Sequence, residues 1–255
     1  MNKKDFIIEN GLLTAYIGKS EYIEVPDEVT AIAEFAFEGN DHIKSVIMPN
    51  SVLEIGRAAF ARCKNLTSIV LSNALTIIEI QLFLGSENLT DIYLPENLKE
   101  IKRLAFYNCG KLSKIDLPEG VSYIGADAFH GCSSLKSIKL PKGLKRIGDR
   151  AFAFCANIQE VAISKEYFDM GCELFYETCS DVRIEYSGAS DDFMKMIFSK
   201  ERSPRLWETM GNVMLYEAIT KSSYQYYYNS EKEFCIEVFC KKDNKHLLFQ
   251  NKPVI

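Results

Sequence analysis

Cysteine and histidine are the residues of this chain whose chemistry could support a metal site or nucleophilic catalysis. The 255 residues include eight cysteines and three histidines. The set that comes nearest to a group of ligands lies late in the sequence and consists of Cys172, Cys179, Cys235, Cys240 and His246. The spacings C-x6-C and C-x4-C-x5-H differ from the short C-x2–4-C unit of structural zinc sites. The sequence therefore predicts neither a metal nor a cofactor.

Catalysis has no visible signature either. The histidines His42, His130 and His246 are far apart, and none forms a recognisable triad with a serine or cysteine nucleophile. A glycine-rich phosphate-binding loop is also missing from the sequence. We therefore predict a protein that is not an enzyme, and an enzyme in the C-terminal segment is a remote alternative.

Charge and hydropathy exclude two further classes of function. The net charge is −5 and the basic residues are scattered, so the sequence predicts no surface for a phosphate backbone and no nucleic-acid partner. No apolar run approaches the roughly 20 residues of a membrane-spanning helix. An export signal is not recognisable at the start of the chain, so we predict a cytoplasmic protein with reduced thiols, without insertion into a membrane.

The remaining cysteines occupy one recurring position. Each lies three residues after a phenylalanine, and the set is Cys63, Cys109, Cys132 and Cys155. Asn40, Ser86 and Thr178 hold the equivalent places, so the position favours a small hydrogen-bonding side chain that faces inward. Stacked strands are about 4.8 Å apart, which makes a Cys109–Cys132 or Cys132–Cys155 disulfide geometrically conceivable. A reducing compartment argues against that bond.

A 23-residue repeat positions these side chains. Its clearest mark is a phenylalanine at Phe37, Phe60, Phe83, Phe106, Phe129, Phe152 and Phe175. The same interval relates an aliphatic series at Val46, Ile69, Ile92, Ile115, Ile138, Val161 and Ile184. Proline and glycine follow in step at Pro49, Pro95, Pro118, Pro141, Gly56, Gly125, Gly148 and Gly171. Because several residue types keep the same 23-residue interval, the sequence predicts seven stacked coils.

One coil, LSKIDLPEGVSYIGADAFHGCSS over Leu112–Ser134, shows the expected anatomy. Its opening alternates, which predicts a short parallel strand with Ile115 and Leu117 inside. Lys114 and Asp116 then face solvent. Each coil can bury its apolar side only against the next, so both ends of the stack need caps.

After the proline turn, Val121 and Ile124 return to the core. The pair Ala128-Phe129 is expected on a tight helical or 3₁₀ turn of the opposite wall.

The motif L-x-x-I-x-LP…I-G-x-x-AF-x-x-C, over roughly Phe6 to Tyr186, resembles the BspA-like leucine-rich repeats of bacteria and some protists. The resemblance implies a leucine-rich repeat solenoid, a right-handed superhelix with a parallel β-sheet on the concave face and short helical or extended turns on the convex face. Members of the family are commonly non-enzymatic, and several types act in surface attachment or protein binding. Because this sequence shows neither an export signal nor a wall anchor, the cell surface is the alternative localisation.

The outward strand positions are the candidate binding residues, because stacked strands present one side chain per coil in a continuous row. The partner-binding residues that we predict are Ile47, Val70, Tyr93, Asp116 and Lys139. The first three are apolar or aromatic, as exposed interface residues often are. The competing interpretation is that branched and aromatic residues simply favour strands.

The coil around Phe83 departs from the repeat. Ser72 replaces the proline, Glu79 the glycine and Leu82 the alanine, and extra apolar residues stand at Ile77, Ile80 and Leu84. We interpret the departures as ordinary repeat decay. Exposure of the extra apolar residues would instead favour self-association.

The sequence divides into a solenoid with its N-terminal cap (1–186) and a small α/β cap or module (187–255). In the second part, the spacing predicts a helix with Phe193, Met196 and Ile197 on one face and another after Ser203-Pro204. The segments YQYYYN, FCIEVFC and HLLF predict strands, with a turn at KKDNK. A cap over the last coil and a separate aromatic binding module both fit.

Together these features predict a protein-interaction module that binds a protein partner on the concave repeat surface. An attachment protein for host protein or glycan is the alternative.

Overall fold

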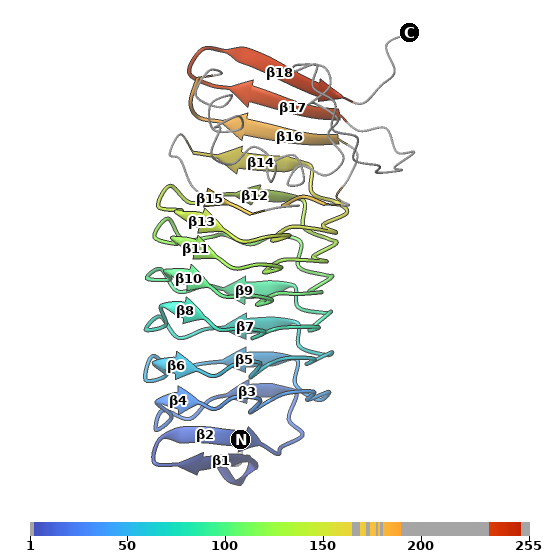
Figure 1. Cartoon of the computed structure of the whole chain (residues 1–255). Coiled ribbons are helices and arrows are strands. Elements are labelled where there is room, and N and C mark those ends of the chain that lie inside the picture. Colours follow the sequence, from blue (N-terminus) through green and yellow to red (C-terminus); the bar gives the residue numbers. More distant parts are fainter. Residues whose placement is uncertain are drawn as a thin grey trace.

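A computed structural model describes residues 3–164, 169–171, 174–176, 178, 181–189 and 235–250. These residues form a β-solenoid of about seven turns with parallel sheets, which confirms the predicted fold (Figure 1). Most coils contribute one short strand to each of two walls, and a third wall is made of turns.

The N-terminal end is closed by a hairpin. A 3₁₀ turn η1 (Lys3–Asp5) leads into β1 (Phe6–Glu9), which pairs antiparallel with β2 (Leu12–Tyr16). β2 then pairs in parallel with the first strand of the stack, β4 (Ala31–Ile32). The hairpin therefore covers the edge that the first coil would otherwise leave open.

The wall that carries the predicted binding residues is called the strand face. Its first sheet has the order β3 (Tyr22–Glu24), β5 (Ser45–Ile47), β7 (Ser68–Val70) and β9 (Asp91–Tyr93). Its second sheet has the order β12 (Ser137–Lys139), β14 (Glu160–Ile163), β16 (Asp181–Tyr186), β17 (Cys235–Cys240) and β18 (Lys245–Gln250).

The second wall holds the two-residue strands. β1, β2, β4 and β6 (Glu54–Ile55) form one sheet. The other sheet contains β8 (Ile77–Ile78), β10 (Glu100–Ile101), β11 (Tyr123–Ile124), β13 (Arg146–Ile147) and β15 (Asp169–Met170).

The third wall consists of tight turns, as expected, but no helix forms there in the described coils. Two positions of each coil have positive φ, which prevents a continuous helix. The first has φ between 52° and 61° and is occupied by Phe35, Ala58, Gln81, Leu104, Asp127 and Arg150. The second is occupied by Gly39, Arg62, Gly85, Asn108, Gly131 and Phe154.

Hydrogen bonds between coils hold the turn wall in this conformation. The amide of Phe106 donates to the carbonyl of Ala128 in the next coil at 2.7 Å, and the amide of Phe129 donates to Ala151 at 2.8 Å. Non-glycine residues ordinarily avoid positive φ, which costs them roughly 1–2 kcal/mol each. The repeated bonds offset that cost because buried backbone groups need partners.

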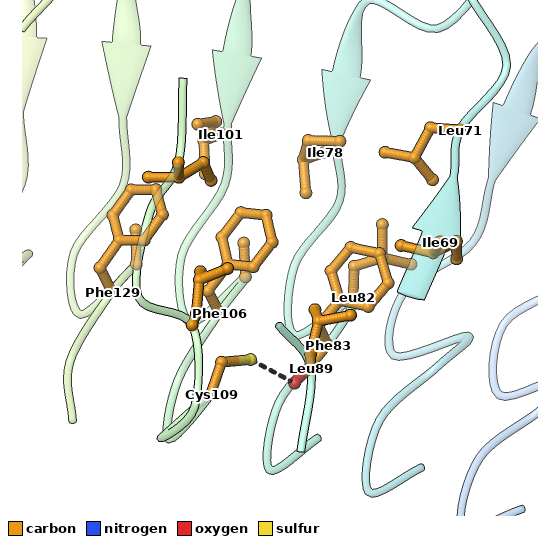
Figure 2. Close-up of a cluster of buried hydrophobic side chains, with 14 of the residues drawn as sticks. Ile69, Leu71, Ile78, Leu82, Phe83, Leu89, Ile101, Phe106, Cys109 and Phe129 are labelled. Carbon is orange, nitrogen blue, oxygen red and sulfur yellow. Dashed lines mark hydrogen bonds between the residues drawn. The ribbon is translucent and has the colours of Figure 1, made fainter. Parts of the chain in front are cut away.

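The repeat phenylalanines form a continuous stack along the core. Neighbouring rings from Phe37 to Phe175 have centroids 4.5–6.0 Å apart. Phe6 and Tyr16 of the N-terminal hairpin extend the stack by two rings. Figure 2 shows Phe83, Phe106 and Phe129 among the aliphatic residues of the two strand walls.

The recurring cysteines also bind adjacent coils together. Cys109 donates its Sγ hydrogen to the carbonyl of Phe83 in the preceding coil at 3.2 Å (Figure 2). Cys63, Cys132 and Cys155 repeat this bond at 3.1–3.2 Å. Ser86 does the same through Oγ, which lies 2.8 Å from the carbonyl oxygen of Phe60. All four cysteines are free, so the position is an inward hydrogen-bonding site, as interpreted from the sequence.

The repeat glycine is required for close contact between coils. A Cβ added at Gly125 would overlap the backbone nitrogen of Arg103, and Gly56, Gly148 and Gly171 face the equivalent obstacle. Gly125→Ala should therefore lower the free energy of unfolding by about 2–3 kcal/mol. Gly110→Ala is the matched control, because its Cβ would come no closer than 3.6 Å to Oγ of Ser133. Equal melting temperatures for the two variants would contradict this packing.

The strand face is interrupted in the coil Leu112–Ser134. The prediction of a strand before Pro118 is wrong. Residues 112–118 belong to neither sheet and lie between β9 and β12. Ile92, Leu94 and Leu117 are half-buried here, whereas their equivalents in most coils are buried. The coils therefore pack less closely at the interruption.

The second wall is interrupted between β6 and β8, at the coil around Phe83 that departs from the repeat. Leu82 is fully buried, while Ile77, Ile80 and Leu84 are half-buried. The extra apolar residues therefore do not form an exposed patch. The exposure that would have favoured self-association is not found.

The C-terminal strands extend the strand face. The described part of FCIEVFC, residues 235–240, and the segment HLLF form the antiparallel pair β17 and β18 around a turn at 241–244, as predicted, and β17 pairs in parallel with β16. The helices expected around Phe193 and after Ser203, and the strand YQYYYN, lie outside the described residues. The division into 1–186 and 187–255 stays a prediction.

Candidate functional site

Three of the predicted binding residues are neighbours on the strand face. Ile47 is in register with Val70, and Val70 is in register with Tyr93. Their side chains are 46%, 37% and 64% exposed, respectively. Because registered parallel strands lie about 4.8 Å apart, the three form one continuous apolar row.

The inward anchor of each strand explains why these side chains face solvent. Val46 and Ile69 are fully buried at the centres of β5 and β7, so alternation turns the first and third residues of each strand outward. Ile92 has the same place in β9. The repeat therefore fixes the register of the row, and the outward residues are free to vary.

The same sheet carries a further exposed aromatic residue, Tyr22, which was not among the predicted binding residues. It lies at the start of β3, in register with Ser45, and is 68% exposed. Position 22 is one repeat before Ser45, so extending the outward rows by one coil would have found it. We call the surface of Tyr22, Ile47, Val70 and Tyr93 the apolar patch.

Asp116 and Lys139, the other two predicted residues, lie apart from the apolar patch. Asp116 is in the segment without a strand, and its Oδ2 is 2.7 Å from Nζ of Lys114. Lys139 is on β12 of the other sheet, with Nζ 2.6 Å from Oε1 of Glu119. The hydrogen bonds from the Lys139 side chain and the Lys142 amide lower the pKa of Glu119.

Polar groups beside the apolar patch are mostly engaged with one another. Ser68 and Ser45 share a hydrogen bond of 2.9 Å between their hydroxyl oxygens. Nζ of Lys44 lies 2.9 Å from Oε1 of Glu21, and this hydrogen bond and charge raise the pKa of Lys44. Lys44, which directly precedes β5, is therefore already paired with a carboxylate.

The turn wall carries the other cluster of charged residues. Asp127, which is buried, has Oδ1 3.1 Å from Nε of Arg150 and 3.3 Å from Nδ1 of His130. The second contact has ion-pair distance without hydrogen-bond alignment. Burial lowers the pKa of His130, whose ring stacks on Tyr107 with centroids 4.6 Å apart. The cluster is a structural network of one buried carboxylate and its two neighbours.

The described part of the chain contains no group of three or more histidine, cysteine, aspartate or glutamate residues arranged to hold a metal ion. It also contains no helix with the length and apolarity to cross a membrane.

The repeat geometry agrees with a known sequence family. The profile of the BspA type leucine-rich repeat region, in six copies, matches residues 14–133 and 99–231. The chain belongs to this family. Its fold and its family are generally non-enzymatic and are typical of protein-interaction or surface-associated proteins.

The chain is similar to several solved leucine-rich repeat structures. A leucine-rich repeat protein of T. pallidum is 31% identical over 69% of this chain and 88% of its own, with a TM-score of 0.66. One from Bacteroides ovatus is 24% identical over 71% of each chain, with a TM-score of 0.48. A leucine-rich cell surface protein of Faecalibacterium prausnitzii is 19% identical over 70% of this chain and 73% of its own, with a TM-score of 0.37. No curated protein sequence matches the chain.

Proposed function

We propose that this chain is a non-enzymatic binding module that docks a protein partner on the strand face, centred on Ile47, Val70 and Tyr93. The observation that carries the proposal is the registered row of exposed apolar side chains. Contiguous exposed apolar surface is typical of interaction sites. The family's general association with protein interaction supports the same conclusion.

Strand propensity alone does not account for the row. Propensity acts on every coil alike, yet the equivalent positions of β12, β14 and β16 hold Lys139, Ala162 and Glu185. The row of exposed large apolar side chains therefore ends at Tyr93 and does not continue onto β12, β14 and β16. Its restriction to neighbouring strands supports recognition as its role.

The test is affinity capture from a lysate of the source organism with the intact chain and Tyr93→Lys. We expect the variant to lose at least one partner that the intact chain retains, because a buried charge in an interface is costly. Leu53→Lys is the matched control, since Leu53 is 59% exposed and lies outside the strand face. Identical captured proteins for all three would exclude the apolar patch as the binding site.

We propose a cytoplasmic site of action, with attachment at the cell surface as the competing proposal. The five cysteines whose side chains the structure describes are all free, which suits a reducing compartment. Cell fractionation with an antibody against the chain should place it in the cytosolic fraction. Labelling of the protein on intact cells by an impermeant reagent would favour the surface.

A further inference from the structure

The two end strands of the first sheet each pair an exposed tyrosine with a carboxylate. On β3, Tyr22 and Glu24 are two residues apart and point to the same face. On β9, Asp91 and Tyr93 have the same relation in reversed order. All four side chains are exposed. A tyrosine ring beside a carboxylate is suited to a lysine or arginine, which gains both a cation–π and an ionic contact.

The outward positions between these ends carry no charge. They are Ser45 and Ile47 on β5 and Ser68 and Val70 on β7. The eight outward positions of β3, β5, β7 and β9 therefore contain two carboxylates and no lysine or arginine. The outward positions of β12 and β14, by contrast, hold both Lys139 and Glu160.

The carboxylates are open to an incoming cation. Among the described residues Glu24 has no ion-pair partner, and Asp91 accepts one hydrogen bond, from Thr90 Oγ1 at 2.7 Å on Oδ2. The nearby Lys44 is engaged by Glu21. Neither of these two carboxylates is therefore held in an ion pair with a described residue.

We propose that the partner presents an extended segment with two basic side chains that flank an apolar one. The inference rests on the proposed function and specifies the partner for the same surface. β3 and β9 are three strand intervals apart, which is about 14 Å. In an extended peptide, residues i, i+2 and i+4 share a face and span about 13 Å. An Arg-x-Ile-x-Arg segment therefore places its arginines over the two tyrosine–carboxylate pairs and its isoleucine over Ile47 and Val70.

The test uses fluorescein-labelled Gly-Arg-Ser-Ile-Ser-Arg-Gly and a peptide with both arginines replaced by glutamate. We expect the intact chain to bind the arginine peptide, by fluorescence anisotropy, and to bind the glutamate peptide at least tenfold more weakly. The double variant Glu24→Lys, Asp91→Lys should bind the arginine peptide about tenfold or more weakly than the intact chain does. Glu160→Lys, an exposed carboxylate of β14, is the control and should change nothing. Melting temperatures verify that each variant is folded.

Equal affinity for the two peptides, or no binding of the arginine peptide up to the solubility limit of the protein, would overturn the proposal. An unaltered affinity after charge reversal at positions 24 and 91 would do the same. These failures are distinguishable from failure of the proposed function. If Tyr93→Lys still loses a captured partner, the apolar patch binds, but a segment of different chemistry occupies it.

Discussion

Replacing Phe106 with alanine should lower the free energy of unfolding by about 3–5 kcal/mol. The ring is fully buried, with centroids 5.3 Å from Phe83 and 5.0 Å from Phe129. Its removal leaves a cavity in the middle of the aromatic stack, and it also loses ring contacts to the coils on both sides. For a chain of this length the expected fall in melting temperature is about 10 °C or more.

The matched control is Phe35→Ala. Phe35 is 46% exposed and lies on the turn wall outside the stack, so its truncation should change the free energy of unfolding by less than about 0.5–1 kcal/mol. Hydrogen exchange adds a spatial test, because each coil of a solenoid depends mainly on its neighbours. Faster exchange after Phe106→Ala should be greatest in the coils of Phe83 and Phe129. Equal melting temperatures for the two variants would contradict a stabilising role of the aromatic stack.

The buried thiols should make the fold sensitive to alkali. Burial raises the pKa of Cys63 and Cys155 to about 12 from the ordinary 9.0, and it also raises the pKa of Cys109 and Cys132. Above pH 9 the unfolded chain therefore releases thiol protons that the folded chain retains. The stability is fully present below pH 9 and falls as the pH rises from 9 toward 12.

At about pH 10 each buried thiol should remove between about 1 and 2 kcal/mol of stability, so the four together should remove on the order of 5 kcal/mol. Denaturant unfolding at pH 8 and pH 10 measures the loss. A variant with serine at positions 63, 109, 132 and 155 is the control, because a hydroxyl does not ionise in this range. Ser86 shows that serine can make the same hydrogen bond between coils. Equal losses for both proteins would exclude the thiols as the cause.

The 23-residue period was sufficient to predict the core and the outward rows. It identified Phe106 and Ile69 as buried and Ile47, Val70 and Tyr93 as outward, because each coil repeats one pattern of burial. Extending the rows by one coil would also have identified Tyr22. The period could not identify the interruption near Pro118, where the residue pattern is intact and the packing between coils is not.

The turn wall was less predictable because its backbone is set by contacts between coils. Leu104 and Phe154 adopt φ of 60° and 57°, although neither residue type favours positive φ. The amide of Leu104 donates to Ala126 and that of Phe154 to Tyr176, both in the following coil. Local residue preference carries no information about such bonds. The repeat also could not predict that Glu24 and Asp91 lie at opposite ends of the apolar patch, because that depends on which strands form the ends of the first sheet.

The most direct test of the proposed binding surface is a photo-crosslinker placed at position 93. A benzoylphenylalanine at this position keeps an exposed aromatic side chain on β9, and one at position 53 serves as the control on another face. After irradiation in lysate, we expect a protein adduct from position 93 that is missing from position 53. The same adducts from both positions, or an adduct from position 53 alone, would contradict recognition on the strand face.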